Sequence, residues 1–258
     1  MNIVLIGSGN VATVLGKKIQ IAGHDILQVA GRNEAACAAL STVLKCSFTI
    51  NWNFINQQAD LYIIAVADTA LEHIHAQINL GKKIVVHTAG SVSKEVLHKV
   101  SKNYGVLYPV QSLHKEKEVL PEIPFLVDGN SNDTIALLKD FAETISDKVR
   151  VAADEPRKKI HLAAVLVNNF TNHLYALTED FCKNEQLDFK ILLPLIEETA
   201  ERIKLYSPAD VQTGPAVRGD ETTINMQLGL LQQYPPLIKL YELFSESIRS
   251  MHKNKNPG

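Results

Sequence analysis

Short apolar runs, many of them rich in β-branched residues, alternate with amphipathic segments along the first half of the chain. Four runs are typical of strands: Asn2–Ile6, Asp25–Ala30, Leu61–Val66 and Lys83–Val86. The last three are almost continuously apolar, as parallel strands are when helices cover both faces of their sheet. Helical periodicity separates the first strands, at Val11–Ala22 and Glu34–Leu44. The pattern therefore predicts βαβα order.

The pattern changes after Asp154. Before it, further elements are predicted, with strands at Gly105–Tyr108, Phe125–Val127 and Lys148–Val151 and helices at Thr69–Ile78 and Asp133–Ile145. Beyond it every predicted element is a helix: Glu155–Lys183, Asp188–Leu205, Thr222–Gln232 and Pro235–Met251, followed by a frayed tail over 253–258. We therefore expect an α/β domain over residues 1–152 and an all-α domain over residues 153–258.

Composition narrows the class of protein further. The 258 residues carry a formal net charge of -2, which disfavours a dedicated nucleic-acid binder. No apolar run reaches the roughly 18 residues that a membrane helix needs, and Met1–Ile6 lacks the basic flank of a signal peptide. The three cysteines are far apart without ligand spacing, so neither zinc nor a disulfide framework is expected. These features predict a cytoplasmic protein without a metal site.

A glycine-rich loop follows the first strand and opens the first helix. It comprises Gly7, Ser8, Gly9, Asn10, Val11 and Ala12. Gly7 would permit the tight turn, Gly9 the close approach of a pyrophosphate, and Ala12 the contact of helix with strand. Strand, loop, helix and second strand come in the order of a dinucleotide-binding unit. The sequence therefore predicts a Rossmann-type, doubly wound, mainly parallel sheet; the alternative is a tight turn that binds no ligand.

The end of the second strand indicates which dinucleotide is bound. An NAD site usually places an acidic residue there to bind the ribose 2′-hydroxyl. This chain has Gly31, Arg32 and Asn33 instead, and the Arg32 guanidinium suits a 2′-phosphate. The pattern favours NADP over NAD, although Glu34 is close by and Arg32 could be a solvated turn residue. The lack of an acidic residue at this strand end also disfavours S-adenosylmethionine, the rival ligand for this fold.

The next two strand ends complete the predicted cofactor site. Carboxyl ends of neighbouring parallel strands meet at the crevice where open α/β sheets bind ligands. The residues expected there are Val66, Ala67 and Asp68 after one strand, and His87, Thr88, Ala89 and Gly90 after the next. Asp68 equally suits the N-cap of the helix Thr69–Ile78, which is the role we favour, and Ser91 or Ser93 suits the cap of the following helix.

Several of these stretches together resemble a known superfamily: the Gly7–Ala12 loop, Gly31–Asn33, His87–Ser91 and Tyr108–Ser112. The likeness is to NADP oxidoreductases allied to pyrroline-5-carboxylate reductase, among them the deazaflavin-dependent NADP reductases and the 6-phosphogluconate and β-hydroxyacid dehydrogenases. The chain is most similar to a bacterial family with a Rossmann-like domain followed by a helical domain of unknown function. The helical half resembles it at His161–Val165, at Asn168 and Asn169, and at Gln212–Asp220. The resemblance implies hydride transfer with NADP and a homodimer.

The long predicted helix supplies candidate catalytic residues. His161, Val165, Asn168 and Asn172 fall near one stripe, and a histidine with several amides is more typical of a polar cleft than of a core. His161 suits a proton donor near neutral pH, or else a hydrogen-bonded structural residue, and Asn168 and Asn169 would orient the substrate. The resemblance places Val165 where β-hydroxyacid dehydrogenases have a catalytic lysine, so simple hydroxyacid oxidation is in doubt.

Two cations are further candidates. Lys158 lies one turn before His161, although a solvated lysine is the simpler interpretation. Arg218 lies in Gln212–Asp220, a loop that resembles in position the substrate segment of pyrroline-5-carboxylate reductases. It could bind a substrate carboxylate, or pair with Asp220, and either residue could cap the next helix.

We therefore expect an NADP-dependent oxidoreductase that reduces a small carbonyl or imine substrate in a cleft between the two domains. The alternative is a non-catalytic NADP-binding redox sensor or assembly subunit, which the missing lysine favours. Neither nucleic acid nor a membrane is an expected partner. Apolar stripes of the helical half would form a homodimer surface or pack within the domain; they include Leu228, Leu231, Leu237, Leu240, Leu243 and Phe244.

Overall fold

The computed structural model describes residues 1–117 and 119–253. By the packing of its Cα atoms the chain forms two compact units, Met1–Asn169 and Phe170–Gly258. The predicted tail beyond Lys253 lies outside the described residues. The expected domain boundary after residue 152 stays a prediction.

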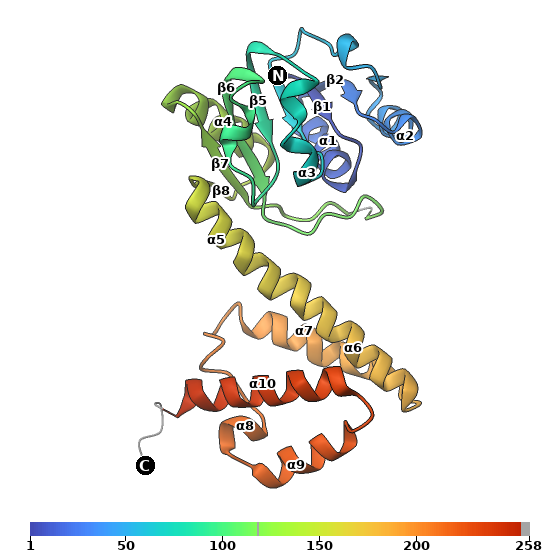
Figure 1. The fold of residues 1–258 in the computed structure, drawn as a ribbon, viewed down its shortest axis with the longest axis vertical. Coiled ribbons are helices and arrows are strands. Elements are labelled where there is room, and N and C mark those ends of the chain that lie inside the picture. Colours follow the sequence, from blue (N-terminus) through green and yellow to red (C-terminus); the bar gives the residue numbers. More distant parts are fainter. Residues whose placement is uncertain (118, 254–258) are drawn as a thin grey trace. The chain divides into compact units, whose positions relative to one another are not determined.

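Within the described residues, the first unit contains one sheet of eight strands in the order β3-β2-β1-β4-β5-β6-β7-β8 (Figure 1). Its strands are β1 (Asn2–Ile6), β2 (Asp25–Ala30), β3 (Ser47–Thr49), β4 (Leu61–Ile64), β5 (Gly81–His87), β6 (Ser101–Pro109), β7 (Phe125–Gly129) and β8 (Val149–Val151). Neighbouring strands of this described sheet pair in parallel except β6 and β7. The predicted mainly parallel, doubly wound sheet is thus confirmed.

Successive residues of the strands face opposite layers. Ile3 and Leu5 of β1 pack in one cluster with α1 (Asn10–Ile21), α2 (Glu34–Leu44) and α4 (Asn132–Ile145). Val4 and Ile6 pack in a second cluster with Leu71, Ile74 and Leu97 on the other face. All four β1 side chains are fully buried. Both faces are therefore covered, which explains why the strands are almost continuously apolar.

The second face is covered by short turns rather than by full helices. α3 spans only Asp68–Leu71, and 3₁₀ turns follow at Ile74–Ala76 and Lys94–Leu97. The predicted helix Thr69–Ile78 is therefore wrong in its extent. Leu71, Ile74 and Ile78 are all buried, and their spacing of three and four suits α and 3₁₀ turns alike. Apolar periodicity could not distinguish the two.

The second half is helical, as predicted. α5 (Asp154–Ala164) continues through a π-helix (Val165–Phe170) into α6 (Thr171–Asn184). α7 (Leu193–Arg202), α8 (Pro215–Arg218), α9 (Glu221–Leu230) and α10 (Pro235–His252) follow (Figure 1). The predicted helix from Asp188 begins as a 3₁₀ turn, Phe189–Leu192, before α7. Among the described helices, none combines the length and apolar character needed to cross a membrane.

Candidate cofactor and substrate site

The chain turns sharply between β1 and α1 at Gly7. Its φ is +129°, and a Cβ there would lie 2.1 Å from the carbonyl oxygen of Ala65. The Gly7 N–H donates to the Ala30 carbonyl at 2.7 Å. This residue must be glycine, and it fixes the loop against the carboxyl ends of both β2 and β4. These strands flank β1 at the point where the strand order reverses, the usual ligand location in such sheets.

Gly9 meets open space. A Cβ at Gly9 would have no protein atom within 4 Å. Gly9 is the N-cap of α1 and provides no side-chain cap, and the first turn of α1 has no acidic residue. Ala12 is fully buried, where a small residue lets helix and sheet approach. The helix N-terminus is therefore left without a protein anion and suits the diphosphate of a dinucleotide.

A pocket of about 600 Å³ opens beside this loop. That volume lies in the range of cofactor and ligand sites. It is lined by Gly7, Ser8, Gly9, Gly31, Arg32, Asn33, Trp52, Ala65, Val66 and Ala67. The structure thus brings eight of the sixteen predicted cofactor residues together around one pocket. The observed glycine turn and this pocket together fit a dinucleotide.

Trp52 was missed by the sequence analysis. It lies on the 3₁₀ turn Trp52–Phe54, directly after β3, a strand that the sequence pattern did not predict. Trp52 is the one tryptophan of the chain, and a large flat ring beside a nucleotide-sized pocket suits a purine base. Without β3, nothing in the sequence placed this ring near the glycine loop.

Arg32 and its neighbours close the other side of the pocket. The Arg32 side chain is exposed, so its guanidinium remains open to solvent and to a ligand. Asn33 caps α2, where its Oδ1 accepts from the Ala36 N–H at 3.0 Å. Glu34 lies in the first turn of α2 and does not line the pocket. Its carboxylate is favourable at a helix N-terminus.

Asp68 has a different role from the one we favoured. The N-cap of α3 is Ala67, so the predicted N-cap at Asp68 is wrong. Ser91 Oγ instead donates to Asp68 Oδ2, which joins the ends of β4 and β5. Ser93 does act as a cap, since its Oγ accepts from the Glu95 N–H at 3.2 Å.

The residues after β5 are the most buried part of the predicted site. His87 is 0 % exposed, and its Nδ1 accepts from the Ala89 N–H at 3.2 Å. Burial, reinforced by the nearby Arg157 cation, lowers the pKa of His87 to about 4. The imidazole is therefore neutral near pH 7 and has no surface to offer a cofactor. Thr88, Ala89 and Gly90 are likewise buried, so any contact of this segment with a cofactor would involve its backbone.

A second pocket, of about 490 Å³, surrounds a tyrosine–histidine pair. Tyr108 Oη at the end of β6 lies 2.9 Å from Nδ1 of His161 on α5. The rings meet edge to face with centroids 5.7 Å apart. Burial raises the pKa of Tyr108, so its hydroxyl stays protonated. The pocket is lined by Tyr108, Val110, Gln111, Ser112, Ile160, His161, Ala163, Ala164, Val165, Val167, Asn168 and Asn169.

Two adjacent amides line the second pocket from a π-helical turn. Val165–Phe170 is π-helical, and this rare, wide turn is frequent at functional sites. The sequence analysis assumed α-helical spacing, yet Asn168 and Asn169 both line the pocket. Asn172, the last member of the predicted stripe, does not. Tyr108 was not a predicted donor, although it lies in a stretch that carried the family resemblance.

The remaining candidates line neither of these two pockets. Lys158 is exposed and pairs with Glu155 at 3.1 Å, as expected of a solvated lysine. Arg218 is an exposed residue at the end of α8 in the second unit. Asp220 caps α9 by accepting from the Thr223 N–H at 3.1 Å. No group of three or more potential metal ligands occurs within the described residues.

Comparisons with known proteins agree with this geometry. Residues 2–91 match a family described as NADP oxidoreductase coenzyme F420-dependent, and residues 123–248 match a domain of unknown function, DUF2520. A Bacteroides fragilis crystal structure, described as a candidate NADP oxidoreductase, is 40% identical with a TM-score of 0.89, covering 96% of this chain and 98% of that one. The chain belongs to the family of that Bacteroides fragilis protein. The resemblance drawn from the sequence is confirmed.

More distant structures share the fold. The 1-pyrroline-5-carboxylate reductase of Streptococcus pyogenes is 16% identical with a TM-score of 0.68, covering 97% of this chain and 98% of that one. A reductive aminase from Aspergillus terreus, in complex with NADPH and ethyl-5-oxohexanoate, is 14% identical with a TM-score of 0.71, covering 99% of both chains. No curated protein has significant sequence similarity to the chain.

Proposed function

We propose that the protein is an NADP-dependent oxidoreductase that transfers hydride between NADPH and a small carbonyl or imine substrate. Its family and its fold support the general class of enzyme, an NADP oxidoreductase. The observation that carries the finer proposal is the Tyr108–His161 pair, which lines a pocket and packs against Gly90 beyond the end of β5. The chemistry requires a cofactor site, a proton donor and a place for the substrate close together.

The cofactor would lie along the carboxyl ends of β1, β2, β4 and β5. The α1 N-terminus would bind its diphosphate, and the Arg32 guanidinium would bind the 2′-phosphate that distinguishes NADP from NAD. NADPH, when bound, supplies the hydride to the substrate carbon. Residues 87–90 lie at the end of β5, and a Cβ on Gly90 would lie 2.6 Å from His161 Nδ1. The predicted cofactor residues therefore reach the tyrosine–histidine pair.

The chain's own part in the chemistry is to supply a proton. The substrate oxygen or nitrogen gains a proton as its carbon gains hydride, which gives an alcohol or an amine. His161 would hold that proton, and Tyr108 would orient its ring or pass the proton on. The amides of Asn168 and Asn169 would bind polar atoms of the substrate.

Ligand binding gives the first test. NADPH at 100 times its Kd should stabilise the protein by about 2.7 kcal/mol, and NADH and S-adenosylmethionine should do much less at equal concentration. Absence of any NADPH response in a thermal-shift assay would overturn the proposal. The alternative, a non-catalytic NADP-binding sensor or assembly subunit, is favoured by Val165 in place of a catalytic lysine and also expects the NADPH response.

Turnover separates the two functions. We expect NADPH oxidation with a cyclic imine such as 2-methyl-1-pyrroline or a small ketone such as cyclohexanone. His161→Ala should lower kcat by about 10²- to 10⁴-fold, the usual contribution of a general acid. NADPH affinity should stay near normal, because the ring lies outside the pocket beside the glycine loop. Unchanged turnover in this variant would place the donor elsewhere.

We further propose a homodimer formed through the helical domain. Several large apolar side chains of the second unit are more than half exposed, among them Ile191, Leu195, Leu205, Leu230 and Leu243. Large apolar side chains exposed in such numbers are expected where a surface associates with another chain. A second copy of the chain is the partner that the family resemblance implies.

A further inference from the structure

Arg157 on α5 is fully buried, although arginine is among the residues least often found inside proteins. It lies one helical turn before His161. Its Nε donates to the Gly90 carbonyl at 3.3 Å, and its Nη2 donates to the Val92 carbonyl. One guanidinium thus binds two carbonyl groups of the Gly90–Val92 loop, which lies between β5 and the 3₁₀ turn Lys94–Leu97.

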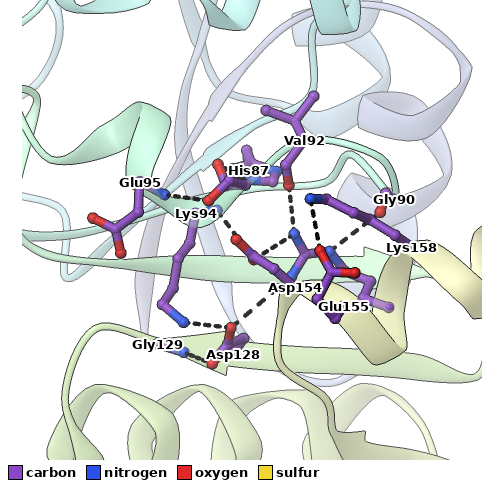
Figure 2. Close-up of polar contacts among 12 residues, drawn as sticks. His87, Gly90, Val92, Lys94, Glu95, Asp128, Gly129, Asp154, Glu155 and Lys158 are labelled. Carbon is purple, nitrogen blue, oxygen red and sulfur yellow. Dashed lines mark hydrogen bonds and ion pairs between the residues drawn. The ribbon is translucent and has the colours of Figure 1, made fainter.

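Two carboxylates compensate the buried charge. Arg157 Nη2 lies 2.8 Å from Asp154 Oδ1, and Nη1 lies 4.0 Å from Asp128 Oδ2 on β7. Lys94 Nζ pairs with the same Asp128 oxygen at 2.7 Å. Figure 2 shows the carboxylates of Asp128 and Asp154, the Lys94 ammonium group and the carbonyl groups of Gly90 and Val92 in one group of polar contacts. Two cations and two anions balance, which is how a charged group is tolerated in a protein interior.

The hydrogen bonding of the guanidinium is incomplete. Nη1 is a buried nitrogen atom without a hydrogen-bond partner among the described residues. Burial acts to raise the pKa of Asp154, but hydrogen bonds from Ser93 and Arg157 outweigh it and lower the pKa. A buried ion cluster with an unsatisfied donor contributes little net stability compared with apolar packing. A role in holding geometry explains its presence better than stability does.

Arg157 and the Tyr108–His161 pair of the candidate site contact the same residue, Gly90. Gly90 packs directly against the pair, because a Cβ there would lie 2.6 Å from His161 Nδ1 and 2.8 Å from Tyr108 Cζ. Arg157 therefore binds the backbone of Gly90 while its own helix carries His161 against the same residue. A shift of the Gly90–Val92 loop relative to α5 would move His161 away from Tyr108.

We infer that Arg157 is a positioning residue, which locks the Gly90–Val92 loop to α5 and so sets the His161–Tyr108 hydrogen bond. Its catalytic meaning rests on the proposed function, whereas its effect on the His161 ring does not. Neither Lys94 nor Asp128 contacts the pair, and both act through the guanidinium and its helix.

The inference is tested by the ¹⁵N signals of the His161 ring, measured on the protein without cofactor. ¹⁵N signals of selectively labelled histidine report which ring nitrogen carries the proton, and His161→Gln assigns the signal. Tyr108→Phe, which lacks the hydroxyl, defines the signature of a broken pair. Arg157→Lys keeps the charge but not the planar fork that reaches two carbonyls. We expect its His161 signals to shift toward those of Tyr108→Phe.

Lys159→Gln is the matched control, since it removes a charge from an exposed position on the same helix and should leave the signals unchanged. Wild-type His161 signals in folded Arg157→Lys would overturn the inference. Should that variant fail to fold, Asp154→Asn removes only one partner of the guanidinium and gives the same readout. Wild-type signals there would equally overturn it.

NADPH titration of the same samples separates the two proposals. A wild-type protein that does not bind NADPH overturns the proposed function but leaves the ring signals interpretable. NADPH binding together with unmoved His161 signals in Arg157→Lys overturns the positioning role alone.

Discussion

At the scale of single residues, we expect one exposed guanidinium to decide between two cofactors. Arg32 lies in the wall of the pocket beside the glycine loop with its side chain open to solvent. Arg32→Asp should weaken NADPH binding by roughly 10- to 100-fold, the worth of a charge-assisted hydrogen bond, and should change NADH binding much less. Isothermal titration with both cofactors measures the difference. Arg150→Asp, an equal charge change outside the pocket lining, is the control, and equal losses for NADPH and NADH would refute the role of Arg32.

His87 gives a prediction of pH dependence. The folded protein holds its pKa at about 4, against 6.5 for the free side chain. The unfolded chain therefore binds a proton between these values while the folded chain does not, and the free energy of unfolding falls as pH drops from 6.5 toward 4. Acidification from pH 7.5 to 4.5 should cost on the order of 2 kcal/mol from this residue alone.

Urea unfolding at the two pH values measures this loss. His87→Gln removes the titrating ring, so its stability should change less over the same interval. The neighbouring Asp154, whose pKa is lowered, loses its contribution only below its ordinary value of 3.8 and lies outside this window. An equal loss in the variant would assign the acid sensitivity to other groups.

At the scale of elements, alanine substitutions of the two loop glycines should have opposite effects on stability and on NADPH binding. Gly7→Ala places a Cβ against the Ala65 carbonyl at a positive φ, so it should lower the free energy of unfolding by about 1–3 kcal/mol or more. Gly9→Ala meets no protein atom and should unfold at the wild-type temperature, yet bind NADPH more weakly. Thermal unfolding with and without NADPH measures both, and normal NADPH binding in Gly9→Ala would contradict the diphosphate site.

Elements with a continuous local signal could be predicted from the sequence. The strands at Asn2–Ile6 and Asp25–Ala30, and the helix Glu34–Leu44, have the predicted bounds. β3 was missed because its three residues include only one large apolar side chain, Phe48, whereas the equally short β8 has two valines. α3 was predicted too long because buried apolar spacing of three and four fits several kinds of helical turn.

The candidate site likewise has one part that could be predicted from the sequence and one part that could not. The glycine loop is contiguous, so its residues could be named from the sequence. Tyr108 and His161 are separated by 53 positions, and Arg157 and Gly90 by 67. Only the strand order brings such residues together. A buried arginine next to lysines and acids in the sequence has no local feature that distinguishes it from a solvated helix face.

At the scale of the whole molecule, the exposed apolar surface of the helical unit predicts association. Light scattering should give a mass of twice the chain's 28.5 kDa, and the unfolding temperature should rise with protein concentration, since dissociation accompanies unfolding. A monomeric mass at micromolar concentration, with an unfolding temperature independent of concentration, would remove the homodimer proposal.

The position of Trp52 has a practical consequence for work on this protein. The chain has a single tryptophan, and it lines the pocket beside the glycine loop. Its ultraviolet emission overlaps the absorption of reduced nicotinamide, so energy transfer should quench it when NADPH enters. If NADPH binds there as proposed, the protein should carry its own fluorescent reporter, and a cofactor titration should need no dye, no label and no knowledge of the substrate.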